Sequence, residues 1–453
     1  MEYIKLDNKQ IPIVEEYDVV VIGGGTSGAV AAISSGRENL KTLVIEHFGS
    51  LGGSQTMGLV TPMMHNHLEG NPYSSAIDEE ICDRMIECGY GMEARGNKGL
   101  FDPQMLKVIL EEMVIESGSD ILYHTSVIDV IRDDNKIKAL LIHNKDGITA
   151  IKAKCFIDCS GDADVVKYAG LPFESGDKDG INQAVSLRFN MSNINIDKFG
   201  DYLESIGQKG RNEYPNFHTA VTRDGNWPMN TLFEQKCEEG ILNEDDLKYF
   251  QVFSVPGKPY DLSFNCPELG GQKNVADAKY LTNKQIQGKK AIIRLTKFLN
   301  EFVPGFEEAY ISDIASMVGI RESRRVIAEY QFKTQDVLGY IKFEDGILQS
   351  NYPLDVHGGD DNFQYVEKDP SQAYFELPYR SLVVKDIDNL LVAGRCIGAD
   401  FLAQSTIRVQ QPCRAMGEAT GIAAKIAIQN NIPFREVDGK LVRDRMKQRG
   451  AKL

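Results

Sequence analysis

Residues 17–46 read YDVVVIGGGTSGAVAAISSGRENLKTLVIE and predict a strand, a glycine turn, a helix and a second strand. The run 17–22 is apolar and β-branched, as expected for a strand that is buried on both faces. Gly23, Gly25 and Gly28 follow it with the G-x-G-x-x-G spacing of a dinucleotide-binding turn. We therefore expect a nucleotide pyrophosphate at the start of the predicted helix.

The three glycines are expected to act differently. Gly23 allows the tight turn, Gly25 lets the backbone approach the pyrophosphate, and Gly28 lets the helix pack on the strand. The backbone N–H groups at Thr26 and Ser27 lie at the positive end of the helix dipole, which favours a bound anion.

An acid at the end of the second strand supports this interpretation. Glu46 stands where such folds use a carboxylate to accept hydrogen bonds from the adenosine ribose hydroxyls, and its charge would repel a 2′-phosphate. A glycine pattern alone occurs in many loops. Here the strand, the helix and the acid all fall within the required span, so a dinucleotide site is strongly favoured.

Length and composition describe a globular protein of two or more domains. The chain has 453 residues, 42% hydrophobic and 25% charged. Its 50 basic and 65 acidic residues give a net charge of −15, which argues against a nucleic-acid partner or an anionic membrane. Its eight cysteines have no C-x-x-C spacing, and we expect reduced thiols and no metal site. The start lacks a signal-peptide pattern and no apolar run could span a membrane, so we expect a cytoplasmic protein.

Further motifs resemble a known kind of flavin domain. An acid followed by the pair Gly52-Gly53 is similar to FAD domains of the glutathione-reductase type, where this segment passes the pyrophosphate and the ribityl chain. In those domains a residue at the position of Val127 meets the adenine through its backbone. The turn Ser160-Gly161-Asp162 resembles their A-T-G-D turn, although a simple turn-forming aspartate is an equal alternative for Asp162.

Three other stretches, Gly319–Arg325, Leu377–Arg380 and Val392–Arg395, closely resemble the bacterial family of FAD-dependent oxidoreductases. The resemblance extends from Tyr17 to Ile428 and is weak between residues 180 and 312. It implies an α/β fold with a discontinuous Rossmann-like FAD-binding domain of the glutathione-reductase type and an inserted α+β substrate domain. We expect the FAD domain at 1–65, 100–170 and 386–432, the substrate domain at 171–385, a connecting segment near the flavin at 66–99, and a C-terminal tail at 433–453.

The cofactor site combines these motifs. We expect a helix to begin near Pro412 and to direct its N-terminus at the N1 and C2 carbonyl edge of the flavin. Arg395 and Arg408 flank the approach to this helix, either adding positive charge or serving only in ion pairs. The residues predicted to contact non-covalently bound FAD are Gly23, Gly25, Thr26, Ser27, Gly28, Glu46, His47, Gly52, Gly53, Ser54, Val127, Gly161, Asp162, Gly394, Arg395, Arg408, Gln411 and Cys413.

Candidate catalytic residues are polar side chains expected near the flavin. His65 and His67 follow the second glycine turn and could act as a general base, or be surface histidines. Arg321 lies one helical turn from Arg325 and could bind a substrate carboxylate if the stretch is helical. An ion-pair network with Glu322 and Glu329 is the alternative. Tyr379 and Arg380 are candidates through the family resemblance alone.

The sequence thus predicts a redox enzyme that passes two electrons between FAD and a small polar or anionic organic substrate, with an electron donor or acceptor that no motif identifies. An FAD-dependent enzyme without net redox, of the hydratase or isomerase type, is one alternative. A non-catalytic nucleotide-binding protein is another. Flavin bleaching on anaerobic addition of substrate separates the first two, and a colourless protein would indicate the third.

Overall fold

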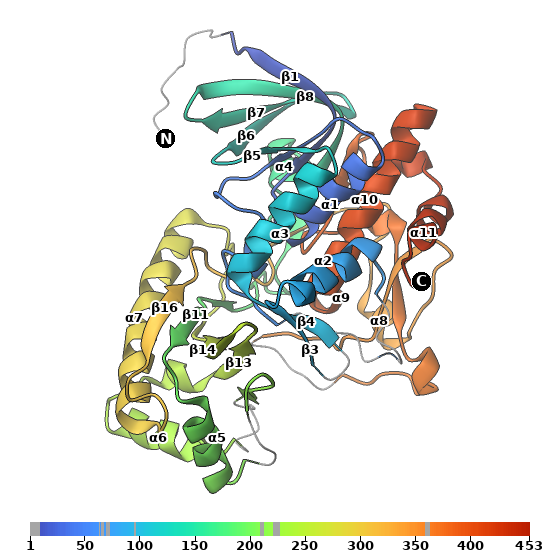
Figure 1. Ribbon diagram of the computed structural model, residues 1–453. Helices are drawn as coiled ribbons and strands as arrows, with labels where there is room; N and C mark the ends of the chain where they lie inside the picture. Colours follow the sequence, from blue (N-terminus) through green and yellow to red (C-terminus); the bar gives the residue numbers. More distant parts are fainter. Residues whose placement is uncertain are drawn as a thin grey trace.

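The computed structural model describes residues 10–62, 64, 68, 73–94, 97–208, 213–220, 227–357 and 363–453. Its largest sheet, drawn at the top of Figure 1, is built from β1 (Ile13–Ile22), β2 (Thr42–Ile45), β5 (Asp120–Leu122), β6 (Ser126–Asp133), β7 (Lys136–Asn144), β8 (Gly147–Asp158) and β20 (Leu390–Val392). The strand order is β5-β2-β1-β8-β7-β6, and β20 pairs with the end of β8.

The parallel part of this sheet determines where the glycine turn lies. Strands β2, β1, β8 and β20 run parallel, whereas β6, β7 and β8 form an antiparallel meander. In the register, Ile22 pairs with Ile45 and with Asp158, and Val392 pairs with Asp158. The four carboxyl ends therefore meet at one edge of the sheet, which is where open α/β sheets bind their ligands.

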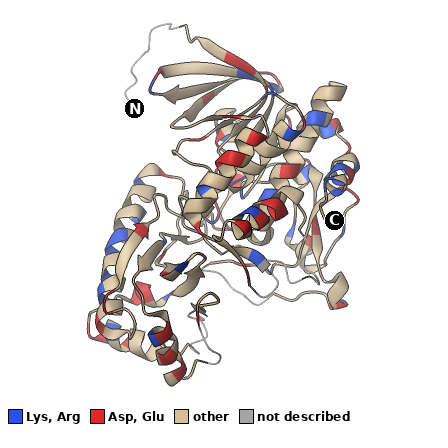
Figure 2. Ribbon diagram, in the orientation of Figure 1, with Lys and Arg blue, Asp and Glu red and all other residues tan. Residues whose placement is uncertain are grey.

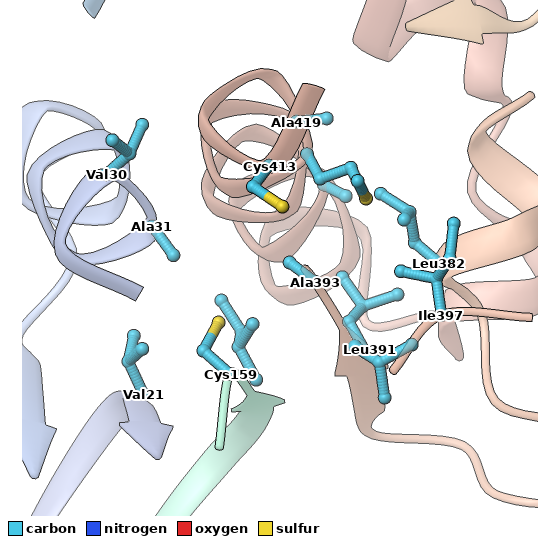
Figure 3. Close-up of a cluster of buried hydrophobic side chains, with 14 of the residues drawn as sticks. Val21, Val30, Ala31, Cys159, Leu382, Leu391, Ala393, Ile397, Cys413 and Ala419 are labelled. Atoms are coloured by element: carbon cyan, nitrogen blue, oxygen red, sulfur yellow. The ribbon is translucent and has the colours of Figure 1, made fainter. Parts of the chain in front are cut away.

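Two long helices pack together over these strand ends. They are α1 (Thr26–Arg37) and α10 (Gln410–Asn430). Figure 3 shows Ala31 of α1 and Cys413 of α10 facing Val21, Cys159 and Ala393 at the end of the sheet. The remaining helices that surround this sheet are α2 (Ala76–Glu87), α3 (Pro103–Glu116), α4 (Asp164–Tyr168), α8 (Thr334–Leu338), α9 (Phe401–Ile407) and α11 (Gly439–Gln448).

A second, antiparallel sheet lies in the inserted part of the chain (Figure 1, lower left). Its order is β12-β13-β14-β11-β16, with bounds β11 (Phe189–Ser192), β12 (His218–Ala220), β13 (Gln251–Val255), β14 (Lys258–Phe264) and β16 (Tyr310–Ile314). The helices α5 (Ile196–Ser205), α6 (Asn230–Glu238) and α7 (Ala278–Phe302) accompany it. Its core is rich in phenylalanine, and the rings of Phe189 and Phe264 stack at 4.5 Å. The expected α/β fold with an inserted α+β unit is confirmed.

The remaining strands in the described part of the chain form four short pairs. They are the paired strands β3 (Gly91–Ala94) and β4 (Asn97–Phe101), β9 (Phe173–Ser175) and β17 (Arg324–Val326), β10 (Val185–Ser186) and β15 (Glu268–Leu269), and β18 (Gly346–Ser350) and β19 (Phe375–Pro378). The 3₁₀ turns are η1 (Gly53–Gln55), η2 (Glu244–Leu247), η3 (Pro370–Gln372), η4 (Tyr379–Leu382) and η5 (Phe434–Glu436).

The hydrophobic clusters divide the chain at different positions from those expected. Val326, Phe332 and Ile347, from the region 171–385, are buried in the same cluster as the main sheet. Tyr73 and Ile77, from the expected connecting segment, are buried there too. The other two clusters are formed by residues between Val185 and Val318, together with Leu59 from the first part of the chain. We infer that the inserted unit spans about residues 185–320 and that the segment after it returns to the FAD-binding unit.

Acidic and basic residues are interspersed along both units (Figure 2). Arg84 of α2, for example, pairs with Glu80 at 2.8 Å and with Glu116 of α3 at 2.7 Å. Such exposed pairs contribute about 0–1 kcal/mol each. Within the described residues, no helix is long and apolar enough to cross a membrane.

Candidate active site

A cavity of about 1270 Å³ lies between the carboxyl edge of the main sheet and the inserted unit. One side is lined by the predicted cofactor residues Gly23, Gly25, Thr26, Ser27, Glu46, His47, Gly53, Ser54, Val127, Gly161, Asp162, Gly394, Arg395, Arg408 and Cys413. The other side includes Arg188, Tyr249, Arg321 and His357. Ligand pockets usually measure roughly 300–1,000 Å³, so this cavity has room for a dinucleotide and a second small molecule.

The glycine turn leaves space where a phosphate would lie. Gly23 has φ +88°, and a Cβ there would lie 2.7 Å from the carbonyl oxygen of Cys159. A Cβ on Gly28 would lie 1.8 Å from the carbonyl oxygen of Gly23, so the helix packs directly on the turn. A Cβ on Gly25 would instead meet nothing closer than 3.9 Å. The glycine at position 25 therefore keeps the cavity open at the N-terminus of α1.

Glu46 holds this turn as well as lining the cavity. Its Oε2 accepts a hydrogen bond from the N–H of Gly24 at 2.8 Å, and its Oε1 accepts one from the N–H of Phe48 at 2.9 Å. The second glycine turn packs against the first, since Gly52 N–H donates to the carbonyl oxygen of Gly24 at 2.8 Å. Gly52 itself, at φ +98°, does not line the cavity.

Asp162 and Arg395 form a charged pair at the cavity wall. Arg395 Nη2 lies 2.9 Å from Asp162 Oδ1, which also accepts a hydrogen bond from Ser323 Oγ at 2.5 Å. Arg395 Nη1 is buried without a hydrogen-bond partner in the part of the chain that is described. The ion-pair role of Arg395 is thus observed, whereas its contact with the cofactor stays a prediction; a bound anion would satisfy Nη1.

The helix α10 begins at Gln410, and Pro412 lies in its first turn as predicted. Val409, Gln410 and Cys413, at the start of this helix, line the cavity. Burial raises the pKa of the Cys413 thiol to about 12, so this residue is a neutral wall group. Gln411 is buried but lies outside the cavity lining.

The arginine stretch at 321–325 is not helical. Arg324 and Arg325 belong to strand β17, so the expectation of a shared helical face is wrong. Arg324 Nη1 pairs with Asp164 Oδ1 at 2.8 Å, and Arg325 pairs with Glu322. Of the three arginines, Arg321 alone lines the cavity.

The other catalytic candidates are Tyr379, Arg380, His65 and His67. Tyr379 is buried and donates to the carbonyl oxygen of Phe434 at 3.1 Å, while Arg380 pairs with Asp345 at 2.9 Å. Neither residue lines the cavity, so their expected position beside the substrate is corrected. They follow strand β19, which pairs with β18, and no residue of these two strands lines the cavity. His65 and His67 lie outside the described residues.

Sequence reasoning missed Arg188 and His357. Arg188 interrupts an apolar run in which Val185, Leu187 and Phe189 are buried, and a basic residue at such a position was the available signal. His357 lies in a loop of Gly and Asp residues with no periodic pattern. Only the folded chain brings it to the cavity.

Comparison with protein families decides the cofactor. A family model described as FAD dependent oxidoreductase matches residues 18–446 of the chain. The chain belongs to this family. As an FAD-dependent oxidoreductase it has FAD as its cofactor, and the open space at Gly25 and the unsatisfied Arg395 Nη1 fit that group. Which of the lining residues contact FAD stays a prediction.

Individual relatives of this FAD-dependent oxidoreductase match only part of it. A digeranylgeranylglycerophospholipid reductase from Thermoplasma volcanium is 28% identical over 212 residues, covering 43% of this chain and 52% of that protein. A thiamine thiazole synthase from Methanococcus vannielii is 31% identical over 165 residues, covering 33% and 59%. The chain thus spans about half the length of the curated relatives it matches. A solved geranylgeranyl bacteriochlorophyll reductase-like protein from Thermoplasma acidophilum has a TM-score of 0.48 at 13% identity, covering 96% of this chain and 83% of that one.

Proposed function

We propose that this FAD-dependent oxidoreductase transfers two electrons between FAD and a small organic acid whose carboxylate is bound by Arg188. The observation that carries the proposal is the state of the Arg188 side chain. It is 2% exposed and lines the cavity, and its Nε has no hydrogen-bond partner among the described residues. Its Nη2 has one long contact, 3.5 Å to Ser263 Oγ. A carboxylate in the cavity would supply the missing partner.

The Arg188 guanidinium is a buried positive charge that would attract an anion. Burial lowers the pKa of Arg188 to about 10, so the guanidinium still carries its proton at neutral pH. A buried charge without a counter-ion is costly, and the cost is relieved when an anion binds. A guanidinium also matches a carboxylate with two parallel hydrogen bonds.

A second arginine extends the positive region. Arg321 lines the same cavity, donates to the carbonyl oxygen of Ala184 at 2.7 Å and lies 3.8 Å from Glu268. Burial and the neighbouring Arg408 lower the pKa of Arg321. Because Arg321 already has a carboxylate nearby, we assign it the orienting role and assign Arg188 the main binding role.

Bound FAD supplies the two-electron chemistry, and the protein holds both reactants. The N-terminus of α1 with Gly25, and Arg395, would hold the phosphate and ribityl portion. The free N–H groups at the start of α10 would stabilise negative charge on the ring. The inserted unit, through Arg188, would hold the substrate over the cavity and exclude water.

The proposal is tested with anaerobic holoenzyme and a panel of small carboxylic acids, each beside its neutral amide. The acids are tested for flavin bleaching and, with dithionite-reduced enzyme, for reoxidation. We expect flavin spectral changes with acids and not with amides. Arg188→Met should raise the dissociation constant of an active acid about 10- to 100-fold, the value of one charged hydrogen bond of roughly 1.5–3 kcal/mol.

Two variants serve as matched controls. Arg188→Lys keeps the positive charge but lacks the planar guanidinium that makes two parallel hydrogen bonds. Its dissociation constant for the acid should lie between those of the wild type and Arg188→Met. Arg84→Met removes a partly buried arginine of α2 that does not line the cavity, and its dissociation constant for the acid should equal that of the wild type. The proposal is wrong if no acid of the panel changes the flavin spectrum, or if acids and amides act equally on the wild type and Arg188→Met.

A further inference from the structure

His357 lies in the same cavity and connects the two units of the protein. It follows β18 in the FAD-binding part of the core, and its side chain is 10% exposed. Its Nδ1 lies 2.5 Å from Oε2 of Glu268, which belongs to β15 in the inserted unit. Glu268 is also buried, at 8% exposure. A histidine is thus held by a buried carboxylate beside the proposed carboxylate site.

This contact determines which ring nitrogen can exchange a proton. A carboxylate is only an acceptor, so the proton of neutral His357 lies on Nδ1, facing Glu268. Nε2 then carries the lone pair. Its distance to Oδ1 of Asp355 is 3.5 Å, longer than a good hydrogen bond. Since His357 lines the cavity, Nε2 is the atom available to a substrate.

The groups around His357 favour its neutral form. The charged groups that face it are Glu268, Asp355, Arg321 and Arg408, and the edge of the Tyr249 ring packs at 5.4 Å. Burial lowers the pKa of His357, Arg321 and Arg408 lower it further, and the two carboxylates only partly offset this. A neutral imidazole can accept a proton at neutral pH.

Asp355 does not compete for this role. Burial raises its pKa, but Arg408, His357 and Arg321 outweigh burial and the net pKa is lowered. Its Oδ2 accepts hydrogen bonds from Arg408 Nη2 at 3.1 Å and from Tyr352 Oη at 3.2 Å. It is therefore an ionised partner of Arg408.

We propose that His357 is the catalytic acid–base residue of this site, exchanging a proton through Nε2 with the hydroxyl of a 2-hydroxy acid, and that Glu268 is its positioning residue. The proposal rests on the function proposed above. A 2-hydroxy acid places its hydroxyl one carbon from the carboxylate. Arg188 and His357 line the same cavity and both have Tyr249 as a neighbour, so we assign adjacent groups of one small molecule to them. A hydroxyl can donate its proton to the lone pair of Nε2 without adding a further charge among the paired arginines and carboxylates around His357, which favours the hydroxy acid over an amino acid.

The reaction balances as follows in the oxidative direction. The O–H bond of the substrate breaks and its proton goes to Nε2 of His357. The oxygen electron pair forms the C=O bond of a 2-oxo acid. The C–H bond breaks with its electron pair, and bound FAD would supply the two-electron acceptor for this hydride. Glu268 stabilises the resulting imidazolium through Nδ1, and in the reverse direction the imidazolium returns the proton.

The first test measures proton uptake when oxalate binds to oxidised holoenzyme. Oxalate has the carboxylate and a second oxygen anion at the hydroxyl position, and it is not oxidised. Titration calorimetry at pH 7 in buffers of different ionisation enthalpy should show uptake of up to one proton, because the second anion raises the pKa of His357. His357→Asn should bind oxalate without this uptake. Equal uptake in both proteins would overturn the assignment.

The second test follows flavin reduction by 2-hydroxy acids against pH. The wild-type rate should rise with pH through an apparent pKa below the usual 6.5 of histidine, and His357→Asn should lower the rate about 10²–10⁴-fold and lose that dependence. Glu268→Gln keeps an acceptor without the charge and should move the pKa lower still. His357→Gln replaces His357→Asn if the latter loses FAD.

The outcomes separate this inference from the proposed function. If oxalate binding depends on Arg188 but the His357 variants keep wild-type rates and pH profiles, the acid–base assignment fails and the anion site stands. Reduction by 2-amino acids and not by 2-hydroxy acids overturns the substrate class. If oxalate does not bind to the wild type, both proposals fail.

Discussion

Gly417 of α10 lies directly against the backbone of Ser27 in α1: a Cβ on Gly417 would be 2.3 Å from the Ser27 carbonyl oxygen. One turn further, a Cβ on Gly421 would be 2.6 Å from the Cβ of Ser34. The two helices thus pack backbone to backbone. Because residues at the start of both helices line the cavity, their contact fixes the glycine turn relative to the N-terminus of α10.

Gly417→Ala should therefore separate these helices. The added methyl group cannot be accommodated without moving the backbone, and overpacking of this kind typically costs 1–3 kcal/mol. We expect a lower free energy of unfolding in urea and a higher dissociation constant for FAD. Gly270→Ala is the matched control, because its Cβ would meet nothing within 4 Å. Equal values for Gly417→Ala and the control would contradict the role of this contact.

Gly25→Val should remove FAD without unfolding the protein. The space around a Cβ at this position is open to 3.9 Å and its φ is −69°, so neither a clash nor backbone strain is expected. The valine would instead occupy the space beside the α1 N-terminus. The apoproteins of wild type and variant should melt at similar temperatures, while the variant elutes without flavin absorbance. An FAD-loaded Gly25→Val would show that the cofactor lies elsewhere.

The framework of the FAD site could be predicted because it depends on local geometry. The turn at Gly23, the acid Glu46 and the helix start near Pro412 each have a signal within a few residues. That helix is α10, which begins at Gln410. Such signals can be recognised from neighbouring residues in the sequence, because they do not depend on tertiary contacts.

The substrate side could not be predicted in this way, because it depends on contacts between distant segments. His357 and Glu268 are separated by 89 positions. Arg321 was chosen as a candidate from a helical spacing that the chain does not adopt. It lines the cavity because it belongs to the loop before β17, whose residues 316–321 form part of the cavity wall. Tyr379 and Arg380 had support only from resemblance, and pairing of β18 with β19 places them elsewhere.

Arg414→Leu should destabilise the fold strongly. Arg414 Nη1 lies 2.6 Å from Asp78 Oδ1, and the side chains are 1% and 0% exposed. Removing one partner of a buried pair leaves an uncompensated charge, which costs about 3–5 kcal/mol. The double variant Asp78→Leu/Arg414→Leu removes both charges and should recover much of this loss. Urea unfolding of the three proteins measures the difference.

The same variant should have a distinctive pH dependence. Burial already raises the pKa of Asp78 to about 6 although Arg414 opposes it, and without Arg414 the pKa rises further. The folded state then binds this proton more tightly than the unfolded state, whose aspartate has a pKa of about 3.9. The stability of Arg414→Leu should therefore fall as pH rises from 5 to 8, more steeply than that of the wild type. A parallel profile would rule out Asp78 as the cause.

Arg408→Met should lower the midpoint potential of the bound flavin. Arg408 lines the cavity and pairs with Asp355, and its Nε has no hydrogen-bond partner within the described chain. Reduction adds negative charge to the flavin, so losing the guanidinium and exposing the Asp355 carboxylate both oppose it. If the variant destabilises the reduced flavin relative to the oxidised flavin by about 1.4 kcal/mol, the midpoint potential of this two-electron couple decreases by roughly 30 mV. Asp355→Asn removes the opposite charge and should raise the potential. Redox titration against a reference dye measures both, and shifts of the same sign in the two variants would show that packing, rather than charge, links this pair to the flavin.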